Sequence, residues 1–117
     1  MQTSDAVGAL SALAHEGRLN AFRLLVRAGP GGLAAGEIAR HTGMLANTLS
    51  AHLGILNAAG LTRSRREGRS ILYRADYDQT RELIAFLMED CCGGEARICA
   101  PLAQLASRAC AAEGATV

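Results

Sequence analysis

The chain has 117 residues, half of them hydrophobic, and its formal net charge at pH 7 is only +1. This length gives room for one domain with a modest core. No stretch approaches the roughly 20 uninterrupted apolar residues of a membrane-spanning helix, and the first residues lack the basic start and long apolar run of a secretory signal. The sequence therefore predicts a cytoplasmic protein without a membrane partner.

Alanine and leucine dominate the hydrophobic residues, whereas there are only two Phe, two Tyr and no Trp. Such small and medium side chains favour a helical fold. A domain this small and apolar often completes its core by forming a dimer.

Apolar residues recur at helical spacing in residues 4–15 and predict a first helix, for which Ser4 is the candidate cap. They form one stripe, which consists of Val7, Leu10, Leu13 and Ala14. A second helix is predicted over residues 16–28. It ends at the Gly-Pro-Gly-Gly run of residues 29–32, because proline and glycine do not extend a helix cheaply.

A short helix over residues 36–43 and a longer helix that begins near Asn47 form the next pair. Gly43 stands where a helix end or a helix–helix turn is expected. Two short helices joined by a tight turn containing glycine are typical of the helix-turn-helix motif. Four leucines of the longer helix share one side and are predicted to face the core: Leu45, Leu49, Leu53 and Leu56.

The opposite face of this longer helix carries small and short hydrogen-bonding residues, where an ordinary surface helix carries long charged ones. Small side chains allow close approach to a groove of DNA, and Asn, Ser and Thr can bond base edges or phosphates. The alternative is a helix that packs on another helix through its small face. We interpret the face as a DNA-contacting surface that carries Asn47, Thr48, Ser50 and Ala51. His52, at the margin of the buried stripe, is a further candidate DNA contact.

Residues 61–66 and 70–75 read as two short strands joined by a turn at Glu67–Gly68. All twelve basic residues of the chain are Arg, which suits bidentate contact with phosphate. Directly after a helix-turn-helix, an arginine-rich hairpin is typical of the winged form of that motif. The alternative is a charged hairpin that only faces solvent. The candidate DNA contacts in the hairpin are Arg63, Arg65, Arg66 and Arg69.

The last clear helix is predicted over residues 77–89 and has a broad apolar face. No later core element covers this face, so we expect a partner subunit to cover it together with residues 4–15. The predicted fold is therefore mainly α with a small β-hairpin wing, a homodimeric winged helix-turn-helix. Residues 1–90 form the predicted DNA-binding and dimerisation domain, and residues 91–117 a cysteine-containing sensor tail.

All four cysteines follow residue 90, as an adjacent pair, Cys91 and Cys92, with Cys99 and Cys110 further on. In a cytosolic protein, clustered cysteines favour metal binding or redox sensing over a structural disulfide framework. Three thiolates form a soft site, which suits a trivalent arsenic or antimony species. Zinc fits less well because structural zinc usually takes four ligands, and the three histidines, His15, His41 and His52, lie far upstream.

Two other interpretations of the cysteines stay open. They can be buried side chains without a function, or they can form a redox switch in which oxidation joins Cys99 to Cys91 or Cys92. A thiol enzyme needs surroundings that favour the thiolate, whereas this cluster follows a helix C-terminus among acidic residues, so we do not predict an enzyme. A protein-interaction module whose hairpin binds an acidic partner would lack the steep salt dependence of binding to duplex DNA.

Residues 4 to about 99 resemble the ArsR-type (ArsR/SmtB) metalloregulatory repressors. Four segments carry the resemblance together: LSALAHEGRLNAFRLLVRAG, GEIARHTGMLANTLSAHLGILNAAGL, REGRSILYRAD and FLMEDCCGG. The resemblance implies a homodimeric winged helix-turn-helix repressor that binds a pseudo-palindromic operator in double-stranded DNA and leaves it when a toxic metal or metalloid binds. It implies the same DNA contacts, on the longer helix and in the wing, that the residue pattern indicates.

The chain departs from two branches of that family. Some relatives carry a Cys-Val-Cys type motif before the recognition helix, and others an acid-and-histidine zinc site at the dimer interface. Residues 36–41 contain no cysteine here, and the last helix contains no histidine. The resemblance therefore implies the branch that senses arsenite or methylarsenite through a vicinal cysteine pair after the last helix, here Cys91 and Cys92. The residue pattern adds Cys99 as a third ligand and antimonite as a further inducing ligand, and no cofactor is required. The pair alone can also be the site, and Cys110 matches no motif of the family.

Overall fold

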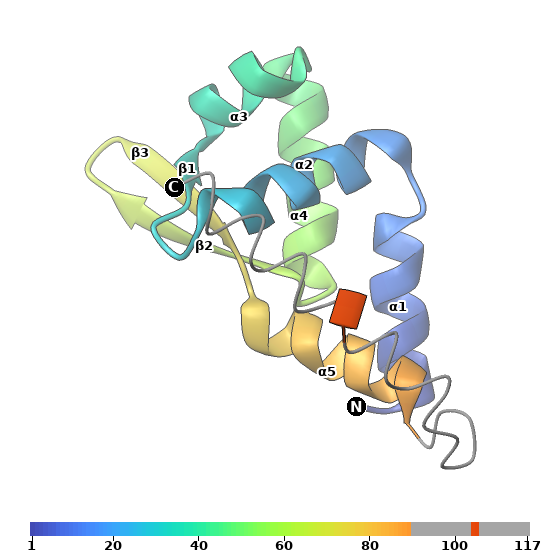
Figure 1. The fold of residues 1–117 in the computed structure, drawn as a ribbon. Coiled ribbons are helices and arrows are strands. Elements are labelled where there is room, and N and C mark those ends of the chain that lie inside the picture. The colour runs from blue at the N-terminus through green and yellow to red at the C-terminus, as the bar shows by residue number, and fades with distance from the viewer. Residues whose placement is uncertain (90–103, 106–117) are drawn as a thin grey trace. The chain divides into compact units, whose positions relative to one another are not determined.

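The computed structural model describes residues 1–89 and 104–105 of the chain, and residues Met1–Phe86 form one compact unit. Figure 1 shows five helices and three strands along residues 1–89. They are α1 (Thr3–Leu13), α2 (Glu16–Ala28), β1 (Leu33–Ala34), α3 (Ala35–Thr42), α4 (Ala46–Ala58), β2 (Thr62–Glu67), β3 (Ser70–Ala75) and α5 (Tyr77–Met88). The predicted helices and hairpin are confirmed, with limits that differ by no more than about two residues. The predicted domain boundary after residue 90 stays a prediction.

The start of α1 differs from the prediction that Ser4 caps it. The N-cap residue is Gln2, and its backbone N–H donates a hydrogen bond to Oδ2 of Asp5 at 3.0 Å. A carboxylate in the first turn is also favoured by the helix dipole.

Small side chains attach α1 to the rest of the unit. Ala6, Ala9 and Ala12 are buried, which lets the backbone of α1 approach its neighbours closely. The larger residues Val7 and Leu10 stay 58% and 42% exposed. Most of the predicted apolar stripe is therefore a surface of this protomer and not part of its core.

The core is built around α4, which packs against α1, α2, α3 and β2 and lies between the wing and α1 in Figure 1. Its side chains are mostly branched aliphatic residues, each of which stabilises the fold by about 1.5–3 kcal/mol when fully buried. The largest fully buried ones are Leu25, Ile38, Leu49, Leu53, Leu56 and Leu61. Three of the four leucines predicted to face the core from α4 are thus confirmed.

The strands form one antiparallel sheet in the order β1-β3-β2. Leu33 of β1 pairs with Tyr73 of β3, and Thr62 of β2 pairs with Ala75 of β3. The sequence did not predict β1, because two residues carry no alternation and the strand exists only through its pairing with β3. The pairing attaches the β2–β3 hairpin, which we call the wing, to the segment before α3.

Gly32, directly before β1, is required by both its backbone and its surroundings. Its φ is +73°, and a Cβ there would overlap the carbonyl oxygen of Tyr73. We expect Gly32→Ala to destabilise the protein by about 2 kcal/mol or more in urea unfolding, because a left-handed conformation alone costs a non-glycine residue about 1–2 kcal/mol. Gly31→Ala is the matched control, since a Cβ at Gly31 has no neighbour within 4 Å. Equal stabilities for the two variants would contradict this prediction.

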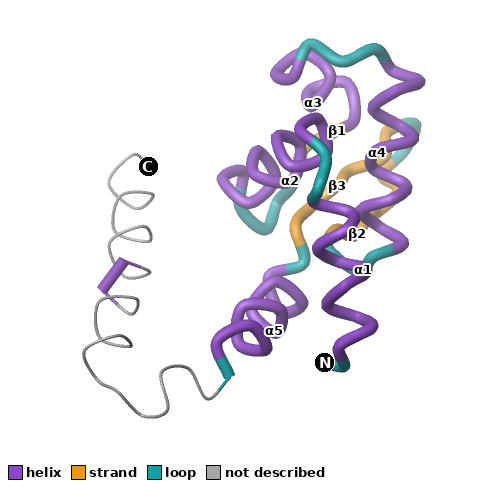
Figure 2. The backbone as a smooth tube through the Cα atoms, turned by 90° about the vertical axis from the view of Figure 1, so that its right-hand side faces the viewer, coloured by secondary structure: helices purple, strands orange, loops and turns teal. Residues whose placement is uncertain are grey.

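The last helix, α5, buries only part of its predicted apolar face. Leu83 is 5% exposed, whereas Ile84 is 57% exposed. The first turns of α5 and the whole of α1 lie at the same end of the unit in Figures 1 and 2. Exposed aliphatic side chains from two helices therefore share one end of the protomer.

Candidate DNA-binding surface

The helix-turn-helix consists of α3, a tight turn and α4. Gly43 ends α3 in the left-handed conformation, and its N–H donates to the carbonyl oxygen of Ala39 at 2.8 Å, as expected for a glycine after a helix. Buried Ile38 on α3 and Leu49 on α4 join the common core and hold the two helices together. The glycine predicted at this turn is confirmed.

The outward face of α4 is open to solvent along its first two turns. Asn47, Thr48, Ser50 and Ala51 are all exposed, and in the described part of the chain these three polar side chains make no hydrogen bond. The N-cap residue of α4 provides no side-chain hydrogen bond to the first turn. The free N–H groups and the positive end of the helix dipole favour negative charge there. This end of α4 can therefore receive a phosphate or a base edge.

Leu45 does not face the core, contrary to the prediction, and is 78% exposed. It lies outside α4 as its N-cap residue, with an extended backbone at φ −67° and ψ 148°, so the helical phase of Leu49 and Leu53 does not apply to it. An exposed aliphatic side chain beside Asn47 is suited to contact a thymine methyl group. The exposure of Leu45 could have been predicted from its position between the turn and the first helical residue of α4.

His52 lies at the margin of the buried side of α4, where the sequence placed it. Its ring is half-buried and lies 4.5 Å, centroid to centroid, from the ring of His15. Nδ1 of His52 is buried and has no hydrogen-bond partner among the described residues. Burial, and then the charges of His15 and Arg18, lower the pKa of His52, so the neutral ring is favoured. The ring therefore contacts the α1–α2 junction, and the assignment of His52 as a DNA contact stays a prediction.

The four wing arginines do not form one cluster. Arg63 pairs across the hairpin with Arg74 and Arg65 with Leu72, whereas Arg66 pairs with Ile71. Paired residues share a face and successive residues alternate, so Arg66 lies on the opposite face from Arg63 and Arg65. The sequence pattern showed the charge but not its division between two faces.

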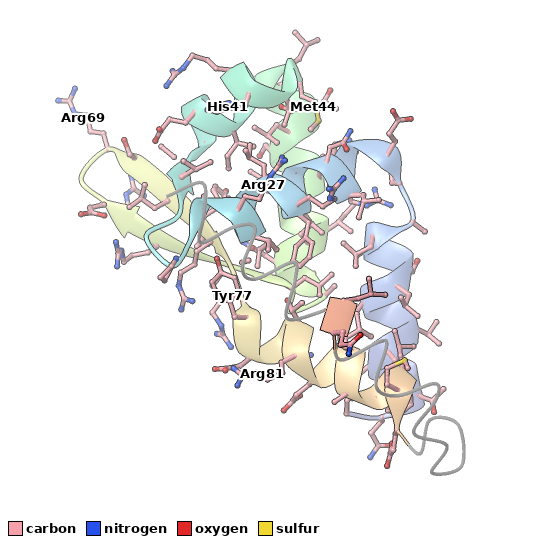
Figure 3. The ribbon with its side chains drawn as sticks, in the orientation of Figure 1. Arg27, His41, Met44, Arg69, Tyr77 and Arg81 are labelled. Carbon is pink, nitrogen blue, oxygen red and sulfur yellow. The ribbon has the colours of Figure 1, made fainter. Side chains whose placement is uncertain are left out.

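Two of these arginines are bonded to acids and two are not. Nε of Arg63 lies 2.7 Å from Asp76 and Nη2 of Arg65 lies 3.1 Å from Glu67. Within residues 1–89, Arg66 and Arg69 form no ion pair, and Figure 3 shows Arg69 projecting from the tip of the wing. Of the four arginines predicted as contacts, Arg66 and Arg69 therefore keep an uncompensated charge.

A small apolar pocket of about 220 Å³ joins the wing to the helix-turn-helix. Its walls include Ile71 and Tyr73 of β3 and Leu49, Ser50 and Leu53 of α4. The wing face that carries Ile71 is therefore turned toward α4, and Arg66 lies on that same face. Of the predicted arginine contacts, Arg66 is the one whose strand position lies on the side of the recognition helix.

Residues 13–65 match the sequence profile of a helix-turn-helix domain family. The chain is 34% identical over 88 residues to the HTH-type transcriptional regulator YgaV of Escherichia coli, a match that covers 75% of this chain and 87% of YgaV. It is 35% identical over 86 residues to the biofilm growth-associated repressor of Agrobacterium fabrum, covering 74% of this chain and 71% of that repressor.

A homodimeric winged helix-turn-helix domain from Mycobacterium bovis, described as a possible ArsR-family regulator, has a similar structure. Its TM-score is 0.61 at 32% identity, with 74% of this chain and 81% of that chain covered. The chain belongs to the ArsR family of transcriptional regulators. As an ArsR-family protein it is a DNA-binding regulator with a winged helix-turn-helix fold, and the matched relatives are regulators of transcription, not enzymes.

The predicted sensor residues Cys91, Cys92 and Cys99, and also Cys110, lie outside the described residues. Within the described residues, no three His, Cys, Asp or Glu side chains are grouped so that they can hold a metal ion. None of the helices described is long and apolar enough to cross a membrane. The position of the inducing ligand therefore stays a prediction.

Proposed function

We propose that this ArsR-family protein is a homodimeric repressor that binds operator DNA through α4 and the wing and is released when a trivalent arsenic species binds its C-terminal cysteines. The DNA-binding part of this proposal rests on the exposed N-terminal half of α4, where small side chains lie among Asn47, Thr48 and Ser50. The major groove admits an α-helix, and the first residues of a recognition helix contact base edges. The uncompensated wing arginines, Arg66 and Arg69, contact the flanking phosphates.

Dimerisation is supported by the exposed aliphatic residues at one end of the protomer. Val7, Leu10 and Ile84 are 58%, 42% and 57% exposed, and an apolar patch on adjacent helices is typical of an interface. A two-fold interface uses the same patch on both subunits. The neighbour from Mycobacterium bovis is itself homodimeric. In such a dimer the two α4 helices enter successive major grooves, roughly 34 Å apart.

The arsenic part of the proposal rests on the donor set of the tail. Cys91, Cys92 and Cys99 supply three soft thiolates within nine residues, and thiolates select soft, thiophilic species. One structural neighbour, 29% identical and with a TM-score of 0.59, is described as a possible transcriptional regulator for arsenical resistance. It covers 68% of this chain and the match covers 79% of that neighbour.

Release follows from coupled binding equilibria. The tail follows α5 directly, and α5 carries part of the proposed dimer surface, so a ligand that binds the tail can change the relative orientation of the subunits. The ligand-bound dimer must bind DNA less tightly, and by linkage DNA must weaken ligand binding by the same factor, typically 5- to 150-fold.

Operator DNA selected from random duplexes, labelled for fluorescence anisotropy, tests this function. We expect arsenite, methylarsenite or antimonite to dissociate the complex. Cys91→Ser and Cys92→Ser should each abolish that response and leave operator affinity within about twofold, because each removes a ligand and no DNA contact. Cys99→Ser measures whether the third thiol is required, and Cys110→Ser is the matched control. An arsenical response that survives in both Cys91→Ser and Cys92→Ser would contradict the assigned site.

The redox alternative is tested in the same titration with hydrogen peroxide. Peroxide would take two electrons and two protons from two thiols, giving one disulfide and two water molecules. Release by peroxide, with no response to the arsenicals, would replace the arsenic proposal by a thiol switch.

A further inference from the structure

Asp76 is the residue at which the recognition helix, the wing and α5 meet. Its backbone N–H donates to the carbonyl oxygen of Leu61 at 2.9 Å, and the N–H of Leu61 donates to Leu56 in the last turns of α4 at 3.1 Å. Its carbonyl oxygen accepts from the backbone N–H of Thr80 at 3.0 Å. The backbone of Asp76 thus connects the end of α4 to the first turn of α5.

The carboxylate of Asp76 makes two further bonds in different directions. Oδ1 accepts from the backbone N–H of Gln79 at 3.0 Å, in the manner of an N-cap for α5. Oδ2 accepts from Nε of Arg63, on strand β2, at 2.7 Å. One buried side chain therefore holds both the start of α5 and the base of the wing.

Cations surround this carboxylate. The hydrogen bond from Gln79, and then the bond and charge of Arg63 with the charge of Arg74, hold the pKa of Asp76 below its ordinary value, although burial opposes the shift. Asp76 is therefore ionised throughout the neutral range. The Arg63 side chain is itself 66% exposed, so its ion pair contributes little to global stability and acts mainly on orientation.

Asp76 lies between β3 and α5, and its side-chain bond to Arg63 ties β2 to the start of α5, in addition to the chain itself and the backbone bond to Leu61. Among the residues described, no side chain of α5 itself bonds to the wing, so the bond from Arg63 is the side-chain hydrogen bond that connects the wing to the residue that caps α5. The hydroxyl of Tyr77, at the start of α5 in Figure 3, donates to Val26 of α2 at 3.0 Å. Asn57 donates to Ser64 at 3.3 Å and so joins α4, not α5, to the wing.

We propose that Asp76 is a positioning residue that makes the orientation of the wing depend on the orientation of α5. When α5 changes its position, the carboxylate carries Arg63 with it, and the wing moves relative to α4. This role rests on the proposed function, in which the signal reaches the DNA-binding surface through α5.

Asp76→Asn separates this role from simple capping. Asparagine caps a helix about as well as aspartate, so its amide oxygen keeps the bond to Gln79. Its NH₂ group then faces Arg63, and two donors cannot bond. We expect the melting temperature of the protein to stay unchanged and hydrogen exchange at the wing amides of residues 63–67 to become faster. We also expect the affinity ratio, which is the operator affinity without arsenite divided by that with arsenite, to fall about fivefold or more.

Arg63→Gln and Arg65→Gln provide the matched pair. Each removes one positive charge from the same face of the wing, but only Arg63 is bonded to Asp76. We expect Arg63→Gln to reduce the affinity ratio as much as Asp76→Asn does. The double variant Arg63→Gln/Asp76→Asn should reduce it no further, whereas Arg65→Gln should keep the wild-type ratio.

The outcomes separate this inference from the proposed function. If wild-type protein is not released by any arsenical, the proposed ligand is wrong, and hydrogen exchange in the ligand-free protein then decides the role of Asp76. Wild-type exchange in the wing of Asp76→Asn, or a wild-type affinity ratio in a protein that does respond, would overturn the positioning role.

Discussion

Ala51→Glu is expected to lower the affinity for operator DNA about a thousandfold while the protein stays folded. Ala51 is exposed on the outward face of α4, one turn after Asn47. A glutamate there places a negative charge where the helix enters the major groove, and like charges brought together at an interface cost several kcal/mol. About 4 kcal/mol corresponds to three orders of magnitude in the dissociation constant. Fluorescence anisotropy at fixed salt measures the change, and circular dichroism checks the fold.

Ala58→Glu is the matched control for this prediction. Ala58 is also exposed and lies on the same side of α4, seven residues further along the helix. A recognition helix contacts base edges mainly with its N-terminal residues, so we expect a loss of no more than about tenfold. Equal losses from the two variants would mean that α4 does not enter the groove with its N-terminal half, and no loss from either would remove α4 from the interface.

Leu10→Glu is expected to convert the dimer into monomers and, as a consequence, to abolish specific operator binding. An unpaired charge buried at an interface costs about 3–5 kcal/mol, and a two-fold interface contains the substitution twice. The dimer dissociation constant should therefore rise by at least about a thousandfold. Sedimentation velocity measures the association state, and the free energy of unfolding should change little because Leu10 is already 42% exposed in the protomer.

Leu19→Glu provides a control of nearly identical exposure, since Leu19 on α2 is 41% exposed. It lies on neither α1 nor α5, so the protein should remain a dimer with wild-type operator affinity. A dimeric Leu10→Glu variant would move the interface away from α1. If both variants are monomers, α2 belongs to the interface as well.

The two predictions share one physical reason. A single wing and recognition helix provide few contacts, so specific binding depends on both halves of the dimer meeting successive grooves at a fixed separation. A change in the proposed dimer surface of α1 and α5 is thus expected to act on DNA binding as strongly as a change on α4. The bond between Asp76 and Arg63 lies between these two surfaces.

Part of the candidate site could be predicted because it depends on one helix alone. The outward position of Asn47, Ser50 and Ala51 follows from helical periodicity, and their exposure agrees with it. Leu45 was predicted wrongly because it precedes α4, where periodicity no longer applies. His52 was placed at the margin of the buried stripe, and its half-buried ring agrees with that. Its contact with the ring of His15 was not predicted, because it joins residues far apart in the chain.

The sequence by itself determined the helices, the hairpin and the turn at Gly43, because spacing and propensity act within a few residues. The soft donor set of the tail stays a prediction from side-chain chemistry. Only the tertiary structure decided which of the four predicted wing arginines keep a free charge. Arg63 is neutralised by Asp76, thirteen residues away, whereas Arg66 and Arg69 have no acidic partner within residues 1–89. It also decided that Val7 and Leu10 lie at the surface, because exposure depends on which elements pack together and not on the pattern within one helix.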